Sequence, residues 1–398
     1  MPNKISNQAK LITIFLFFWV FWLTYNWYNE YKLGTKTVAL IFLTLIAFVF
    51  GWLLNRRKSQ IVILAPSNYY KIIHFFKTII YINLIVSIAS LISIYSRGFN
   101  HRDLIFTSAG LFNSVWITLF LNYIIQPLTY AAIIIATITK IEGKKFTRYA
   151  YFLLFLMVIQ TLGRFPMYYM IYLYVVNKII DSTISIQLLR KKRNIIFKFL
   201  GTLFVISVIL YGAWKLQISK MEFEGRGLDA SMIIKTYLLN YHVIGFHMLD
   251  HFVYSNNINY TFPTTSLGSI GWFLNLITKY SMVLPIFPNS FNELMEIYNN
   301  GLFLKTLNMP ANAFTTCILP FYADGGFLGV FICFFLIGWF SKSGIQYNIY
   351  SANPIFISVV FFMTFSLFMP LISSILWSTV IWIVIINKYL RTKLVIKK

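Results

Sequence analysis

Four arginines in this sequence have surroundings that suit the binding of an anionic group. Arg164 stands in a Gly-Arg-Phe-Pro break at the end of an apolar run, and Arg226 is flanked by two glycines. Arg97 and Arg102 follow the third apolar run. A guanidinium stays charged and binds phosphate or carboxylate through paired hydrogen bonds. We expect these side chains to bind an anionic substrate; the alternative is that each is a solvated or snorkelling charge.

A second cluster combines histidine and aspartate. His242, His247, Asp250 and His251 occur within ten residues, and His247 and His251 are four apart, so on a helix they share a face. The spacing resembles an inverted zinc-protease pattern, but Asp stands where the Glu base belongs. We therefore predict no bound metal. His242, His247 or Asp250 is instead expected to act as a general base or hydrogen-bonding group. The alternative is an amphipathic helix whose histidines face water.

The longest contiguous pattern lies late in the chain. Asn312-Ala-Phe-Thr-Thr is followed by Phe-Tyr322-Ala-Asp324-Gly-Gly-Phe-Leu-Gly. An acid directly before a glycine-rich helix start suits the positive end of the helix dipole, and glycines permit close helix packing. The simplest interpretation is that Asp324 caps a membrane span.

The elements that hold these residues are predicted from composition. The chain is 58% apolar, 19% aromatic and only 11% charged, with a mean hydropathy of +0.70. Soluble domains have about 25% charged residues, and apolar runs near the ~20 residues of a membrane span recur throughout. The sequence therefore predicts an all-α polytopic membrane protein and not a β-barrel, which would show short alternating segments.

The net charge of +23 could indicate nucleic-acid binding, but its placement indicates a membrane topology. Twenty-three of the 34 Lys and Arg residues fall on one set of predicted loops and termini, with only Glu142 and Asp181 as acids. The other set has 11 basic and 9 acidic residues. This asymmetry follows the positive-inside rule. We expect both termini to be cytoplasmic in a bacterial inner membrane, and no nucleic-acid partner.

About ten transmembrane helices and one large outer segment account for the hydropathy pattern. Residues 1–216 are predicted to hold helices one to seven, residues 217–324 a large periplasmic segment, and residues 325–398 helices eight to ten. The expected spans are 11–28, 38–54, 78–95, 115–139 with a bend near Pro127, 149–162, 167–188, 199–216, 325–341, 354–368 and 371–386. The segment 217–324 contains seven of the eleven acidic residues, so we expect the chemistry there.

The Asn312…Tyr322-x-Asp324-x-Gly pattern, opening a late span after one large outer loop, resembles the Wzy-type oligosaccharide repeat-unit polymerases (O-antigen polymerases). The Gly-Arg164 break is similar to an inner arginine of that family. The related O-antigen ligases carry a His-Asn pair at this point, whereas Ala311 precedes Asn312 here. That departure favours a polymerase and leaves the identity of the general base open.

The resemblance implies a GT-C-like glycosyltransferase that joins undecaprenyl-diphosphate-linked oligosaccharide repeat units into a surface polysaccharide on the periplasmic face. Together with the residue analysis above, this makes Asp324, His242, His247 and Asp250 the candidate catalytic residues, and Asn312, Tyr322, Arg97, Arg102, Arg164 and Arg226 the candidate substrate-binding residues. The resemblance implies no cofactor; expected partners are membrane lipid and a chain-length regulator protein. The alternatives are a flippase or other transporter of the same lipid-linked oligosaccharide, and an O-antigen ligase.

Overall fold

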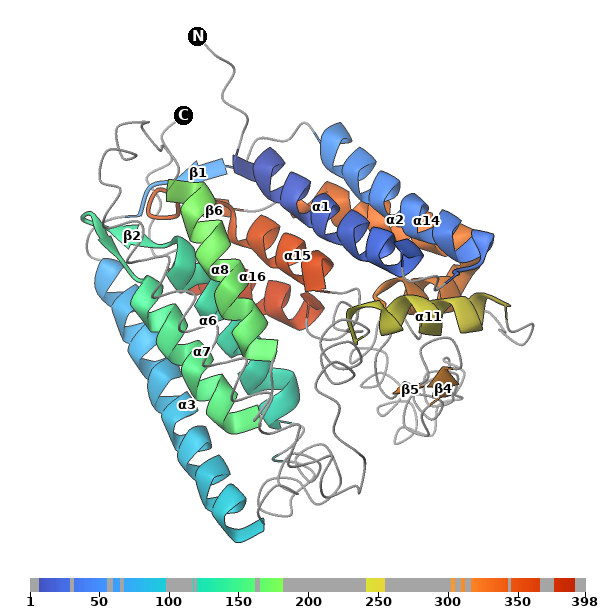
Figure 1. Ribbon diagram of the computed structural model, residues 1–398. Coiled ribbons are helices and arrows are strands. Elements are labelled where there is room, and N and C mark those ends of the chain that lie inside the picture. Colours follow the sequence, from blue (N-terminus) through green and yellow to red (C-terminus); the bar gives the residue numbers. More distant parts are fainter. Residues whose placement is uncertain are drawn as a thin grey trace, which may run out of the picture.

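The protein is mostly helical (Figure 1). The computed structural model describes residues 7–28, 32–55, 60–64, 68–97, 117, 120–161, 165–181, 241–254, 302–304, 309–311, 316–342, 345–365 and 376–390. Four of the described helices are long and apolar enough to cross a membrane, by length and composition: α1 (Asn7–Tyr28), α2 (Thr35–Leu54), α3 (Tyr69–Arg97) and α14 (Ile318–Ser341). The prediction of an α-helical membrane protein is confirmed at this coarse level.

Among the described residues, five shorter helices are also largely apolar. They are α6 (Gln126–Ile138), α7 (Thr147–Thr161), α8 (Phe165–Asp181), α15 (Pro354–Phe365) and α16 (Trp377–Leu390). A π-helical turn, η4 (Leu121–Ile125), runs directly into α6, so Pro127 lies in the first turn of that helix. Proline cannot donate a hydrogen bond to the preceding turn, so it fits best where the helix is irregular, as at this π-helical turn.

Of the helices that the structure describes, α2 and α14 form the closest pair, and they run parallel and in contact along much of their length. A Cβ at Gly51 would overlap the carbonyl oxygen of Phe335, and a Cβ at Gly338 would overlap that of Phe48. The two backbones therefore approach each other only because both positions lack side chains, as in other small-residue helix interfaces. Asn55 Nδ2 donates to the Trp339 carbonyl at the end of this pair (2.5 Å).

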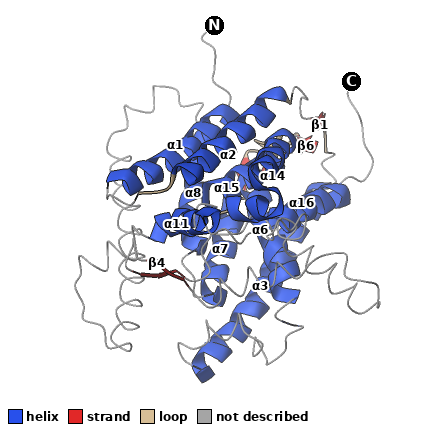
Figure 2. Ribbon diagram, turned by 90° about the vertical axis from the view of Figure 1, so that its right-hand side faces the viewer, coloured by secondary structure: helices blue, strands red, loops and turns tan. Residues whose placement is uncertain are grey.

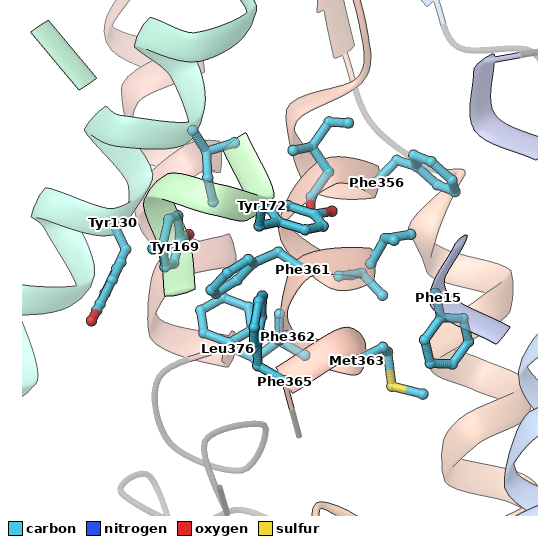
Figure 3. Close-up of a cluster of buried hydrophobic side chains, with 14 of the residues drawn as sticks. Phe15, Tyr130, Tyr169, Tyr172, Phe356, Phe361, Phe362, Met363, Phe365 and Leu376 are labelled. Atoms are coloured by element: carbon cyan, nitrogen blue, oxygen red, sulfur yellow. The ribbon is translucent and has the colours of Figure 1, made fainter. Parts of the chain in front are cut away.

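An aromatic core fills the centre of the bundle (Figure 3). Tyr130 of α6 stacks on Tyr169 of α8 with ring centroids 5.1 Å apart, and both lie beside the fully buried Phe361 and Phe362 of α15. The indole Nε1 of Trp19, on α1, donates to the Met363 carbonyl of α15 (2.8 Å). The core thus ties the first helix to a helix near the end of the chain.

A buried polar network joins α3, α6 and α7. Asn83 Nδ2 donates to Thr129 Oγ1 (2.9 Å), and Gln160 Nε2 donates to the Asn83 carbonyl and Oδ1 and to Ser87 Oγ (3.0–3.1 Å). Polar groups inside an apolar bundle need such partners. In membrane helices these bonds add modest specific attraction, so the network sets the register of the three helices.

Loops from three parts of the chain meet at one end of the bundle, which we call the strand end. Strand β1 (Gln60–Val62) pairs in parallel with β6 (Ile345–Tyr347), and β2 (Lys140–Ile141) forms a hairpin with β3 (Lys144–Lys145). A β-bridge between Thr139 and Tyr350 links the two pairs. Figure 2 shows β1 and β6 at the edge of the helical bundle. A further hairpin, β4 (Leu302–Leu304) with β5 (Met309–Ala311), lies elsewhere.

Many described basic residues belong to the strand end: Lys71, Lys77, Lys140, Lys144, Lys145, Arg148, Lys342 and Lys388. The last turn of α16 reaches this end because Tyr347 and Tyr350 both donate hydroxyl hydrogen bonds to Asn387. The grouping matches the basic set of loops that the charge asymmetry predicted to be cytoplasmic. Which side of a membrane it faces stays a prediction.

Several predicted spans need correction. Helix α3 begins at Tyr69, whereas the sequence analysis assigned residues up to Lys77 to a loop. Helix α14 begins at Ile318, whereas a start at Gly325 was expected. The predicted span 199–216 and the predicted turn between the spans 354–368 and 371–386 lie outside the described residues. The count of ten spans and the GT-C-like architecture stay predictions.

Candidate functional site

Helix α14 is broken where the motif of the sequence analysis lies. Gly325 (φ −160°, ψ 23°) and Gly326 (φ 58°, ψ −146°) are non-helical, so the helix divides into a short segment before them and a long one after. Only glycine adopts the Gly326 conformation without strain. A Cβ at Gly325 would meet no described atom within 4 Å, so there is space on this side of the break.

Asp324 is the last residue before the break and is only 3% exposed. It is not the N-cap of the span, because one helical segment precedes it. It nevertheless lies directly before the second segment, whose first amides have no helical partner and whose dipole favours a negative charge. Burial of a carboxylate at a helix break costs free energy unless hydrogen-bond donors or cations contact it. Such a group is a candidate for acid–base chemistry.

Tyr322 lies in the same segment of α14 and is 8% exposed. Its ring meets that of Phe327, across the break, edge to face at 6.1 Å between centroids. The pair spans the two segments of the broken helix. Tyr322 and Asp324, both predicted site residues, thus lie in the short segment of α14 before the break.

Helix α11 (Tyr241–Tyr254) contacts α1, α2 and α14. In Figure 1 it lies across the end of α1 and the starts of α2 and α14, opposite to the strand end; we call this region the α11 end. His247 is buried there, and its Nε2 lies 2.8 Å from Asn26 Oδ1 on α1. An amide oxygen only accepts, so Nε2 carries the hydrogen in this contact.

Burial lowers the pKa of His247 to about 4, and the nearby Asp250 carboxylate opposes that shift only in part. The imidazole is therefore neutral at pH 7. A neutral imidazole has one donor and one acceptor nitrogen, so it can accept a proton only if its surroundings open or gain negative charge. His247 accordingly fastens α11 to α1 in this state.

Asp250 and Tyr254 complete the attachment of α11 by capping the start of α2. Asp250 Oδ1 accepts from the Gly34 amide (2.8 Å) and from Thr37 Oγ1 (2.5 Å), and Tyr254 Oη accepts from the Lys36 amide (3.1 Å). These acceptors supply partners for the amides that a helix N-terminus leaves open. The negative charge of Asp250 also suits the dipole of α2. We assign Asp250 a positioning role.

The remaining predicted residues are described only in part or not at all. His242 belongs to the first turn of α11 and Arg97 is the final residue of α3; neither side chain is described. The other predicted substrate-binding residues lie outside the described residues: Arg102, Arg164, Arg226 and Asn312. Among the described residues, no group of three or more His, Cys, Asp or Glu side chains is arranged to hold a metal ion.

The residues that hold α11 in place were not predicted from the sequence. Asn26, Gly34 and Thr37 contact His247 or Asp250 across more than 200 positions of sequence. The glycine at position 34 is the only trace of this contact in the local sequence. In the structure, a Cβ at Gly34 would overlap the ring of Tyr254. Comparison with known protein families, with curated proteins and with solved structures yields no match.

Proposed function

We propose that this chain is a membrane glycosyltransferase that polymerises oligosaccharide repeat units carried on undecaprenyl diphosphate. The observation that carries the proposal is the buried Asp324 beside the Gly325–Gly326 break, with the largely buried Tyr322 two residues earlier in the same helix. The motif that resembles the repeat-unit polymerases therefore coincides with a helix break and a buried carboxylate.

In the proposed reaction, a hydroxyl of the acceptor sugar attacks the anomeric carbon of the donor glycan. The new glycosidic C–O bond forms while the bond to the diphosphate oxygen breaks, and undecaprenyl diphosphate leaves with the electron pair. Asp324 takes the hydroxyl proton as general base, and Tyr322 offers a phenol to the sugar. General-base catalysis contributes about 10²–10⁴-fold, so Asp324 is the residue whose loss should matter most.

The diphosphate leaving group needs positive charge. The helical segment that follows Gly326 has its N-terminus at the break, and the positive dipole end of a helix there favours an anionic group. The predicted arginines, Arg164 and Arg226 above all, would add guanidinium groups that stabilise the charge developing on the leaving oxygen. Asp250 and His247 enter this proposal only by holding α11 against α1 and α2.

The test is a polymerisation assay with purified protein and a synthetic undecaprenyl-diphosphate repeat unit, read as a ladder of chain lengths on a gel. Asp324→Asn keeps the side-chain volume and removes the base, so we expect at least about a hundredfold slower ladder formation. A ladder of wild-type rate from this variant contradicts the assignment of Asp324.

The matched control is Asp250→Asn, the same chemical change on the neighbouring helix. It should leave the ladder within about threefold of wild type, because Asn still offers an oxygen to the Gly34 amide. Arg164→Ala and Arg226→Ala are expected to yield products of single-repeat length in cells. Transfer to a lipid A core instead of a second repeat unit would reassign the protein as a ligase.

A flippase is the second candidate, and the broken α14 is the observation in its favour. Many secondary transporters use interrupted membrane helices whose half-helix ends face the substrate. A flippase moves labelled lipid-linked oligosaccharide across proteoliposomes and forms no new glycosidic bond. The polymerase proposal expects bond formation in the same vesicles, so one preparation distinguishes the two.

A further inference from the structure

A surface pocket of about 430 Å³ lies at the strand end, away from the candidate site. Its lining consists of Tyr70, Lys71, Ile73, His74, Lys77 and Tyr389. Five of these six side chains come from the first turns of α3, and Tyr389 comes from the last turn of α16. The lining includes two lysines and a histidine and no acidic side chain, so its charge favours an anionic ligand.

The pocket groups of α3 continue into an exposed apolar stripe. Tyr70, His74 and Lys77 are exposed and lie on the same face of α3 as a row of further exposed side chains. That row consists of Tyr81, Ile85, Ile88 and Ile92. The opposite face, with Ile72, Phe76 and Ile79, is buried against the bundle. One helix face thus offers a lysine and a histidine at its end and about three turns of hydrocarbon beyond them.

The polar and aromatic groups of the pocket are arranged as at a membrane interface. The Lys71 ammonium lies 5.9 Å from the centre of the Tyr389 ring, which fixes α3 and α16 on the two sides of the pocket. Tyrosines at the headgroup level are common in membrane proteins. Basic pockets between membrane helices bind the headgroups of anionic lipids.

We propose that this pocket binds the phosphate headgroup of an anionic membrane phospholipid, whose acyl chains lie along the exposed face of α3. Lys71, His74 and Lys77 contact the phosphate, and Tyr70 and Tyr389 flank it. The inference does not depend on the proposed glycosyl transfer, because the pocket and Asp324 belong to opposite ends of the bundle.

The experiment measures lipid retention by native mass spectrometry of the full chain, released from detergent micelles that contain equal amounts of phosphatidylglycerol and phosphatidylcholine. The wild-type protein should retain phosphatidylglycerol in preference. Each basic side chain near an anionic lipid surface strengthens binding about fivefold. Lys71→Gln/Lys77→Gln should therefore weaken phosphatidylglycerol retention by about twenty-five-fold.

The matched control is Lys140→Gln/Lys144→Gln, which removes the same charge from the exposed lysines of the β2–β3 hairpin at the same end. It should retain phosphatidylglycerol within about twofold of wild type. If the double pocket variant does not fold, Lys77→Glu, at an exposed position, replaces it, with Lys144→Glu as its control.

Three outcomes overturn the proposal: equal retention of the two lipids by wild type, equal losses in the pocket and control variants, or complete displacement of phosphatidylglycerol by millimolar inorganic phosphate. The last would identify a free phosphate ion as the ligand. Preferential retention that only the pocket variants lose supports a lipid.

Discussion

The two ends of this bundle differ in whether histidine and aspartate side chains take part in the bonds that hold them together. At the strand end, loops distant in sequence join through main-chain hydrogen bonds, such as the Lys140 amide to the Ile349 carbonyl (2.8 Å) and the Asn348 amide to the Val62 carbonyl (3.0 Å). At the α11 end, side chains make the hydrogen bonds that join the helices: His247 bonds to Asn26, and Asp250 bonds to the Gly34 amide. Main-chain bonds do not titrate, whereas imidazole and carboxylate do.

The charges differ in the same sense. Lysines are exposed on the strand end, where Lys140, Lys144 and Lys145 stand in water-facing positions. The α11 end contains a buried carboxylate, Asp324, beside a broken helix. The strand end is therefore expected to keep its structure as the pH changes, whereas the α11 end contains ionisable groups on which its structure depends. Four perturbations test this division.

The largest effect is expected at the α2–α14 interface, which connects the two ends. Gly338→Ala places a methyl group against the Phe48 carbonyl, and this backbone cannot move aside cheaply. Overpacking of this kind costs about 3 kcal/mol, and both ends should loosen together. The measurement is the apparent melting temperature in detergent.

The control for this variant is Gly325→Ala in the same helix, which meets no described atom and has extended φ. Its stability should stay within about 0.5 kcal/mol of wild type. If Gly338→Ala melts like Gly325→Ala, the two helices do not depend on close backbone contact.

Lowering the pH from 7 to 5 should weaken the α11 end alone. The pKa of His247 is about 4 in the folded protein and about 6.5 when unfolded. The unfolded chain therefore binds more protons in this interval, and stability present above pH 6.5 is lost as pH falls through about 4. The loss by pH 5 is about 2 kcal/mol.

Hydrogen exchange, corrected for the intrinsic effect of pH, follows this difference. Amides of α11 and the start of α2 should lose protection at pH 5, and those of β1 and β6 should keep theirs. His247→Gln should abolish the pH dependence, whereas substitution of the exposed His251 by Gln should preserve it. Equal loss of protection at both ends would contradict the division.

Removal of the Asp250 carboxylate should have a smaller, local effect. Asp250→Ala takes the acceptor from the Gly34 amide and the Thr37 hydroxyl, and loss of a helix cap costs about 1–2 kcal/mol. Limited proteolysis should then cleave near the start of α2 more readily. Asp250→Asn keeps an oxygen and should lose only about 0.5 kcal/mol, the dipole contribution.

The smallest change is a gain at the strand end. Glu142 (φ 48°) and Gly143 (φ 78°) form the two-residue turn of the β2–β3 hairpin, and their positive φ values fit the turn type that prefers Asn-Gly. Glu142→Asn should raise stability by about 0.5 kcal/mol, seen as a small rise in melting temperature. Glu142→Gln removes the same charge without this preference and should show no gain.

Hydropathy predicted the helical class and, to within a few residues, the bounds of α1, α2 and α7. Hydropathy placed the start of α3 too late in the chain, because Lys71, His74 and Lys77 lower the local apolar average. These three residues nevertheless belong to one continuous helix and line the same pocket. Hydropathy also failed at the start of α14, where Pro320, Asp324 and two glycines read as a loop. The short segment before the break is helical because it is packed on all sides: Ile318, Leu319 and Phe321 are buried.

The tertiary contacts of the candidate residues could not be predicted from the sequence, and their roles stay predictions. Local spacing paired His247 with His251, yet the first is buried against Asn26 and the second is exposed. No local pattern can reveal that Asp250 caps a helix 216 positions earlier. Such contacts depend on tertiary packing, which a single sequence does not encode in any short window.

The contact between α2 and α14 also determines when the protein can finish folding. Asn55 and Trp339, bonded at the end of that pair, are 284 residues apart. At typical translation speeds, the ribosome needs about 15 to 60 s to cover this interval. Until α14 is synthesised, the face of α2 around Gly51 can contact only lipid or a chaperone. A nascent chain that stalls before α14 therefore lacks the helix that packs most closely against α2.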